Sequence, residues 1–214
     1  MKNTIVNLSS KLKRTFSGNF SKRVFFSALT VFLVSTFAFS DEYSVNKSAS
    51  KVKWEAKKVT GKHDGTISFV NGSVKLNGNK ISDGSFVIDM NTIVVTDITD
   101  PGTNKKLVGH LSSDDFFSVA KFPQSKLEIK NSELKSGDNY RFVGDLTIKG
   151  ITKPVEFDAK VNVSSGKLTA SGIITVNRTL YDIKYGSGSF FSGLGDKMIY
   201  DDFTLEFEFI ADKK

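Results

Sequence analysis

The sequence predicts an all-β protein of eight or nine antiparallel strands, with a single β-barrel as the favoured architecture and short helical turns around residues 103–121. Three observations predict this fold class. Apolar and polar residues alternate with a period of two, which is typical of strands with one buried and one solvated face. Gly, Asn and Asp separate short runs of this pattern, as in a meander of hairpins. Helical periodicity is almost absent, so strand–helix–strand units are not expected.

The first forty residues differ in composition from the rest, and we predict that residues 1–40 are a cleaved signal peptide. Six basic residues without any acidic residue precede an apolar run at 24–39, and Ala38 and Ser40 supply small residues for signal peptidase. A membrane anchor is the alternative, but this run is shorter than the roughly 20 residues that span a bilayer. The predicted domain is therefore residues 41–214.

The predicted mature part has almost no net charge. The chain has 30 Lys and Arg, of which 24 remain after residue 40, against 23 Asp and Glu. A nucleic-acid-binding protein would need a basic patch in this part, so we expect no nucleic-acid partner. Because the chain has no cysteine, it must rely on a hydrophobic core, which a domain of this size can form.

The alternation predicts eight or nine strands of five to eight residues each. Their apolar faces fall, in chain order, at 52–56, 67–69, 74–76, 86–90, 127–129, 140–148, 155–163, 168–176 and 203–209. Predicted turns in the first half lie at 60–65, 71–72, 77–79 and 83–84. A β-sandwich is the alternative architecture. Gly144, Ala170 and Gly172 on the inward faces leave space between strands, which favours a barrel that can hold one small ligand.

Residues 84–123 interrupt this repeated pattern. A strand with alternating apolar residues leads into an acidic turn with Pro101 and Gly102, and then into an aromatic segment. Ser112 and Asp115 resemble a capping box for helical turns in this segment. We expect the segment to close one end of the barrel or to line the pocket entrance with the side chains of Leu107, Leu111, Phe116 and Phe117.

Recognisable catalytic motifs are absent from the sequence, including GxSxG, HExxH and the phosphate-binding GxxxxGK[ST]. The two histidines, His63 and His110, lie 47 positions apart, and a metal site would need both together with Asp64 or Asp114. We therefore predict no catalytic residue and no metal site.

Two polar residues lie where a ligand could reach them. His63, between two glycines, either caps its own turn or brings its imidazole over the barrel end. Arg178 continues the apolar face of residues 168–176, so it must emerge at the rim or pair with an acid. Pairing with Asp182 or Asp89 would make Arg178 structural, and a free guanidinium would bind a ligand head group.

Five motifs occur in order along the chain. They are Trp54 followed by Gly61-x-His63-x-Gly65, FVIDMNTI at 86–93, KLVGHLSSDDFF at 106–117 with Lys-Phe-Pro at 121–123, GDLTIKGITKPV at 144–155, and Asn177-Arg178. With these motifs, residues 42–211 resemble the YceI family of polyisoprenoid-binding or lipid-binding periplasmic proteins. The chain departs from the family where an acid, a Phe and a Gly usually follow Asn177-Arg178. It has Thr179, Leu180, Tyr181 and Asp182 there.

The resemblance implies a single lipocalin-like, extended eight-stranded antiparallel β-barrel that holds a long apolar ligand, such as a polyisoprenoid, an isoprenoid quinone or a fatty-acid or amide-like lipid. It also implies a periplasmic location, a homodimer, a membrane b-type cytochrome as partner, and no catalytic activity or cofactor apart from the bound lipid. An enzyme acting on a lipid head group and an interaction protein whose barrel is filled by its own side chains are the alternatives.

We predict that the ligand contacts inward-facing residues of the strands, the aromatic segment and the two polar residues at the rim. The predicted ligand-binding residues are Trp54, His63, Phe69, Phe86, Ile88, Met90, Phe116, Phe117, Phe142, Leu146, Ile148, Phe157, Ile174, Val176 and Arg178.

Overall fold

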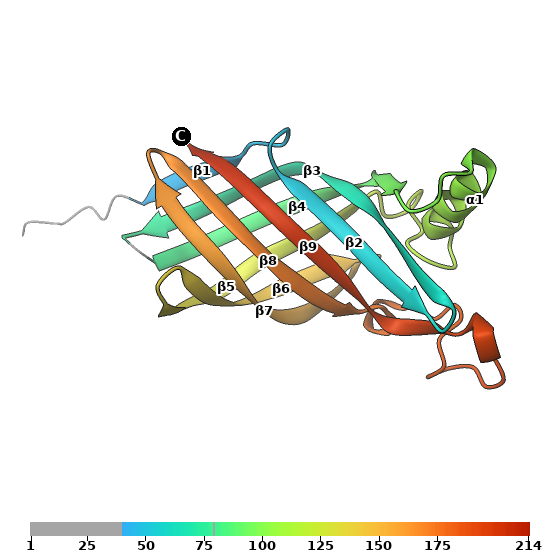
Figure 1. Ribbon diagram of the computed structural model, residues 1–214. Coiled ribbons are helices and arrows are strands. Elements are labelled where there is room, and N and C mark those ends of the chain that lie inside the picture. Colours follow the sequence, from blue (N-terminus) through green and yellow to red (C-terminus); the bar gives the residue numbers. More distant parts are fainter. Residues whose placement is uncertain (1–39, 79) are drawn as a thin grey trace, which may run out of the picture. The chain divides into compact units, whose positions relative to one another are not determined.

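The computed structural model describes residues 40–78 and 80–214. The predicted signal peptide therefore lies outside the described residues, apart from its last position. The described part contains nine strands, one α-helix and two short 3₁₀-helices (Figure 1). The strands are β1 (Asp41–Val45), β2 (Lys51–Lys58), β3 (Gly61–Asn77), β4 (Lys80–Val95), β5 (Gln124–Ser136), β6 (Asn139–Ile148), β7 (Ile151–Ser164), β8 (Lys167–Asn177) and β9 (Ile199–Lys213). The helices are α1 (Pro101–Ser112), η1 (Arg178–Tyr181) and η2 (Gly195–Lys197).

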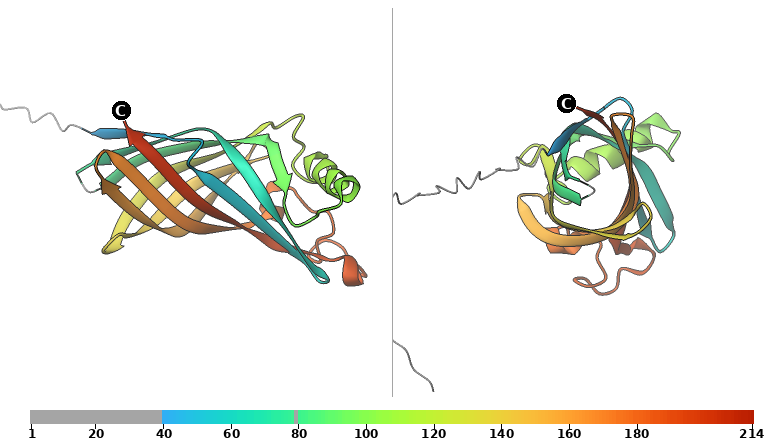
Figure 2. Two further views of the ribbon diagram at one scale, coloured as in Figure 1. Left: turned by 45° about the horizontal axis from the view of Figure 1, so that its top comes forward. Right: turned by 90° about the vertical axis from the view of Figure 1, so that its left-hand side faces the viewer.

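The sheet closes on itself into an eight-stranded antiparallel barrel, which confirms the predicted fold and rules out the sandwich (Figure 2). Strands β2 to β9 pair in a ring, with β3 bonded to both β2 and β4. Strand β1 occupies the same place in the ring as β2, further along the barrel. Like β2, it lies between β3 and β9, and it pairs with the C-terminal ends of both. Nine strands thus fill eight positions, and each strand of the ring pairs on both sides over at least part of its length.

Most strands are longer than the predicted five to eight residues, and in β3 and β4 expected turns lie inside the strands. Strand β3 has 17 residues and runs through Asn71-Gly72, and β4 has 16 residues and runs through Asp83-Gly84. At Gly72 a Cβ atom would lie 3.1 Å from the Phe86 ring, so the missing side chain makes room for an aromatic ring. The predicted turn at 77–79 does join β3 to β4, with Gly78 at a φ of 60°.

The two ends of the barrel are built differently (Figure 1). One end, here called the helix end, carries α1, the β2–β3 turn and the connection between β8 and β9. We call that connection, residues 178–198, the β8–β9 segment. The other end, here called the terminal end, carries β1, the C-terminus and the β3–β4, β5–β6 and β7–β8 hairpins.

Helix α1 confirms that helical structure lies in the interruption between β4 and β5, although it begins two residues before the predicted range. Asp100 is its N-cap and accepts a 2.8 Å hydrogen bond from the Thr103 backbone N–H, and Pro101 suits the first helical position. The predicted capping box at Ser112 is wrong, because Ser112 is the last residue of the helix. Turns then carry the chain to β5.

Charged residues on the outer face of the barrel pair across the strands, as in the contacts of Arg141 with Glu156 (2.9 Å) and Asp158 (3.2 Å). The inward residues form one hydrophobic core that draws on every strand. Residues 41–214 therefore hold all strands of the closed sheet together with their own core. Within the described residues, the helices are too short or too polar to cross a bilayer.

Candidate functional site

A cavity runs along the inside of the barrel. The centre of a water-sized sphere can move through about 200 Å³ of it. Its lining extends along β9 from Ile199 to Phe209. Ten residues of a tilted strand correspond to roughly 25 Å along the barrel axis. The walls are almost wholly apolar, so the barrel contains space for a long, thin, apolar molecule, and its own side chains do not fill it.

Most of the predicted ligand-binding residues line this cavity. Thirteen of the fifteen do so: Trp54, Phe69, Phe86, Ile88, Met90, Phe116, Phe117, Phe142, Leu146, Ile148, Phe157, Ile174 and Arg178. The other two are His63 and Val176, which lie outside the lining. Val176 is a buried core residue, and His63 lies at the rim.

Sequence reasoning missed much of the cavity wall. The missed positions include the four apolar residues of the last strand, Phe203, Leu205, Phe207 and Phe209. Their alternation with polar residues places them on an inward face of the last predicted strand, but they were not named as ligand contacts. Others, such as Ile183, follow no strand periodicity, so their position inside depends on how the β8–β9 segment folds back.

A β-bulge shapes the cavity wall in β4. Between the pairs Ser68–Asp89 and Thr66–Val94, four residues of β4 (90–93) oppose the single residue Ile67 of β3. The Asp89 carboxylate accepts the backbone N–H of Asn91 at 3.0 Å, and the Thr92 hydroxyl accepts the Ser68 backbone N–H at 2.9 Å. These side chains replace the lost ladder bonds, and the extra residues let both Met90 and Ile93 face the cavity.

The helix end of the cavity is covered by chain segments that lie outside the sheet. Leu111 and the ring of Phe116 are buried there, and Phe117 packs edge-on against Phe203 with ring centroids 6.4 Å apart. All three line the cavity, as predicted for the end-closing segment, whereas Leu107 packs on the core without lining it. At the terminal end, Tyr43 of β1 is buried and lies outside the cavity lining.

Arg178 is held in place by backbone carbonyls. Its Nη1 donates to the Ile183 carbonyl at 2.8 Å, and its Nε and Nη2 donate to those of Tyr200 and Ile199, each at 3.0 Å. The side chain is 4% exposed. Of the two alternatives that the sequence leaves open for Arg178, the structure shows pairing with an acid. The acid is Asp201, with Nη2 and Oδ1 3.5 Å apart, and neither Asp182 nor Asp89 is the partner.

The Arg178–Asp201 pair ties the β8–β9 segment to β9. Burial lowers the pKa of Arg178, and the Asp201 carboxylate opposes that shift. Burial raises the pKa of Asp201, but hydrogen bonds from Ser187 and Ser189 and the charge of Arg178 outweigh it, so the net pKa is lowered. Both groups therefore stay charged at neutral pH and fix the segment against the barrel rim.

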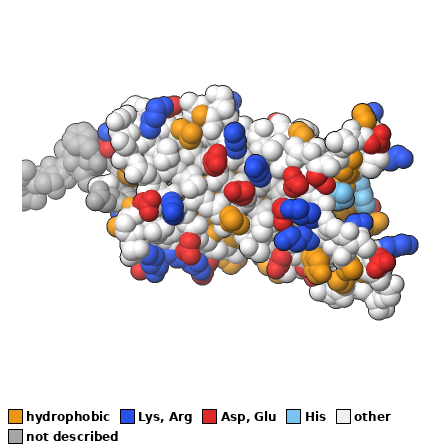
Figure 3. Space-filling view, viewed as in Figure 1, with side chains coloured by type: hydrophobic (Ala, Val, Ile, Leu, Met, Phe, Trp, Pro, Cys, Tyr) orange, Lys and Arg blue, Asp and Glu red, His pale blue; other side chains and the backbone are white. Residues whose placement is uncertain are grey.

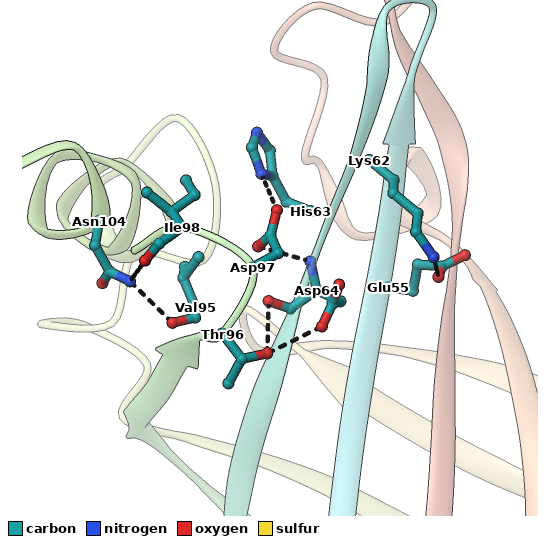
Figure 4. A network of polar contacts seen from close by, with 9 residues as sticks. All are labelled: Glu55, Lys62, His63, Asp64, Val95, Thr96, Asp97, Ile98 and Asn104. Carbon is teal, nitrogen blue, oxygen red and sulfur yellow. Dashed lines mark hydrogen bonds and ion pairs between the residues drawn. The ribbon is translucent and has the colours of Figure 1, made fainter. Parts of the chain in front are cut away.

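A polar network at the rim holds the end of β4 to β3 (Figure 4). The His63 Nδ1 lies 2.8 Å from the Asp97 carboxylate, whose other oxygen accepts the Asp64 backbone N–H at 3.2 Å. Burial opposes ionisation of Asp97, but its bonds to His63 and Asp64 leave the pKa lowered. The predicted turn at 60–65 is wrong here, because Gly61 already begins β3 and His63 lies in a strand.

Neither histidine is part of a metal site in the described residues, where no cluster of three His, Asp or Glu side chains could hold an ion. His110 contacts Asp115 at 3.2 Å and packs edge-on against Phe116 and Tyr185, with ring centroids 4.9 and 4.6 Å apart. His110 therefore joins α1 to the β8–β9 segment.

The match to a known protein family covers most of this barrel. Residues 43–211 match the YceI-like domain. The chain belongs to the YceI-like domain family. The match includes the Trp54–Gly65 motif, the bulge of β4, the end-closing segment and Arg178, all of which shape the cavity or its rim.

Solved structures of YceI-like and polyisoprenoid-binding proteins share this fold. Burkholderia cenocepacia BcnA matches with a TM-score of 0.64 at 21% identity, over 78% of this chain and 98% of that one. A polyisoprenoid-binding domain from Saccharophagus degradans, implicated in plant cell wall breakdown, matches with a TM-score of 0.58 at 15% identity. The match covers 80% of this chain and 98% of that one. At these identities the likeness extends to the fold alone.

Curated relatives are similar over a shorter stretch. A UPF0312 protein of Yersinia pestis (strain Pestoides F) is 36% identical over 87 residues, which cover 37% of this YceI-like chain and 44% of the relative. A UPF0312 protein of Shewanella denitrificans is 34% identical over 95 residues, covering 44% and 47%. The chain thus spans less than half the length of these relatives.

Proposed function

We propose that this YceI-like protein is an exported periplasmic binding protein that sequesters or carries a long apolar ligand inside its barrel. The observation that carries the proposal is the cavity, which is apolar along roughly 25 Å of the barrel. A polyisoprenoid, an isoprenoid quinone or a fatty-acid or amide-like lipid would fit such a space. The polyisoprenoid-binding relative from Saccharophagus degradans supports this ligand class.

The cavity wall favours a hydrocarbon chain over a polar molecule. Few polar residues line it, and two of these have partners within the protein. The Ser125 hydroxyl lies 3.1 Å from the Met90 sulfur, and the Arg178 guanidinium donates to three backbone carbonyls. A polar group buried here would lose its hydrogen bonds to water, whereas burying ten CH₂ groups gains on the order of 8 kcal/mol before ordering costs.

Ligand entry is proposed at the helix end. At the terminal end the chain segments are hairpins of hydrogen-bonded strands, so a large movement there would break strand pairing. The helix end is covered by residues 107–119 and by the β8–β9 segment, which can move without breaking strand pairing. The tail would therefore lie deep in the barrel and any head group near this end.

Extraction of the protein tests the proposal directly. Organic extraction of freshly purified protein, followed by mass spectrometry, is expected to recover a lipid with a long apolar chain. Purified protein should also take up a fluorescent prenyl probe saturably. If neither a recovered lipid nor saturable uptake is found, the proposal is wrong.

A pair of variants localises the binding to the cavity. Ala170 lines the cavity, and the neighbouring Ser171 is exposed on the outer face. Ala170→Trp is expected to fill part of the cavity and reduce probe uptake, while Ser171→Trp leaves it unchanged. Circular dichroism on both variants checks that the barrel is intact.

We also propose that the protein is a binder and not an enzyme. Both histidines contact aspartates outside the cavity lining, so an acid–base pair facing the ligand is missing among the described lining residues. Unchanged ligand after long incubation is the expected result, and a converted product would favour the enzyme. The homodimer and the b-type cytochrome partner remain predictions, to be tested by sedimentation and by co-purification from membranes.

A further inference from the structure

The helix end carries apolar side chains that are exposed on the outside of the barrel. Ten large hydrophobic residues in the described chain are exposed, and six of them belong to the β8–β9 segment or its immediate neighbours. We call these six the aromatic patch: Val59, Leu180, Tyr185, Phe190, Phe191 and Tyr200, each about half exposed. Figure 3 shows hydrophobic side chains gathered at this end of the barrel.

The loop that presents Phe190 and Phe191 is internally hydrogen-bonded. The Ser187 carbonyl accepts the backbone N–H groups of both phenylalanines, at 3.2 and 3.0 Å, and Ser187 itself is fully buried. The Ser189 hydroxyl donates to Asp201 at 2.6 Å, and Asp201 in turn faces Arg178. Exposure of the two rings is therefore built into the structure of the loop.

The β8–β9 segment is apolar on both sides. Ile183 is fully buried and lines the cavity. Ile199, just after the segment, also lines the cavity. The opposite side carries the aromatic patch, and the loop projects beyond the barrel (Figure 1). A single layer of chain thus separates the apolar interior from an apolar outer surface.

We propose that the aromatic patch docks the protein on the surface of a lipid bilayer, with the helix end facing the lipid. Aromatic rings beside lysines are characteristic of membrane interfaces, where the ring enters the head-group layer and the ammonium stays in water. The Lys184 ammonium lies 5.1 Å from the Phe190 ring centroid, and Lys197 lies in the same segment. Acidic residues such as Asp182 and Asp196 balance these lysines, so ring insertion drives the docking.

A bilayer fits this patch better than a flat protein partner, because the two phenylalanines are on a projecting loop and lie at the covered end of the cavity. Docking would serve to transfer an apolar ligand between the bilayer and the barrel, and this purpose rests on the proposed function. Docking itself can be measured without ligand, so the two proposals fail independently.

The test is flotation of the barrel, residues 41–214, with phosphatidylcholine vesicles, with and without added phosphatidylglycerol. The wild-type barrel is expected to float with both. The double variant Phe190→Ser with Phe191→Ser is expected to partition at least about tenfold more weakly, since two half-exposed rings are lost. The matched control is Ile173→Ser, which removes an exposed apolar side chain from the wall of the barrel. It should float like wild type.

Several results would overturn the proposal. Wild-type barrel that does not associate with either vesicle, or a double variant that associates as well as wild type, contradicts docking. Sedimentation is the second measurement. A wild-type dimer that the double variant loses, without vesicle binding, would show that a second copy covers the patch instead. Transfer of a prenyl probe from vesicles should also slow in the double variant, while its equilibrium affinity in solution stays unchanged.

Discussion

The indole of Trp54 lies against Gly65, its partner residue on the neighbouring strand. A Cβ atom at Gly65 would be 2.7 Å from the Trp54 ring and 1.7 Å from the Val94 carbonyl oxygen. The indole N–H donates to that same carbonyl at 3.2 Å. The glycine thus lets the tryptophan close onto β4, where it forms part of the cavity wall.

Gly65→Ala is therefore expected to destabilise the protein by about 2–4 kcal/mol, because the carbonyl and the ring must both move. Urea unfolding measures the change. Gly109→Ala is the control: Gly109 lies in α1 with open space around its Cβ position, and alanine there should be neutral or stabilising by about 0.5–1 kcal/mol. Equal losses for both variants would contradict the close-contact argument.

Phe117→Ala is expected to weaken ligand retention more than it weakens folding. Phe117 is only partly buried, packs edge-on against Phe203 and lines the cavity at the helix end. Probe release should accelerate about tenfold, with a stability loss of about 1–2 kcal/mol. Stopped-flow release and urea unfolding provide the comparison. Proportionate losses of both would make Phe117 an ordinary core residue.

Arg178→Met should destabilise the helix end, because it leaves three backbone carbonyls without their donor and the Asp201 carboxylate without its cation. The expected loss is about 3–5 kcal/mol. Trypsin should then cut faster at Lys184 and Lys197 in the β8–β9 segment. Arg178→Lys keeps the charge but cannot reach three carbonyls at once, so an intermediate loss is expected. Normal stability with lost ligand binding would instead assign Arg178 to the ligand.

Stability is expected to fall in alkali through Tyr181. Burial raises the pKa of Tyr181 to about 12, from an ordinary value of 10.0. Between these values the phenol is ionised in the unfolded chain but neutral in the folded one. The unfolded state then binds fewer protons, so stability decreases as pH rises, by about 2–3 kcal/mol in total. Below pH 10 the residue contributes no pH dependence.

Tyr181→Phe isolates this effect. Urea unfolding at a series of alkaline pH values should show a shallower decline in the variant than in wild type. Identical slopes would mean that Tyr181 ionises as easily in the folded protein as in the unfolded one.

The strand pattern was predictable because it is local. Alternation at positions such as Phe203 and Leu205 reports which side chains face inward, and closure of eight such strands follows from burying one face of each. The turns were less predictable, because Gly72 and Gly84 look like turn residues. In the structure they make room for Phe86 and Ile129 on neighbouring strands, and that requirement exists only after the sheet has formed.

The all-β class, the inward residues of the regular strands and the family motifs can be read from the amino-acid sequence alone. These depend on period-two burial and on residues near one another in the chain. The folded barrel is needed to see that Arg178 pairs with Asp201, that Ile183 lies inside while Phe190 and Phe191 lie outside, and that two loop segments cover one end of the cavity. These contacts join segments without any periodic pattern, so they are determined by packing over the finished barrel.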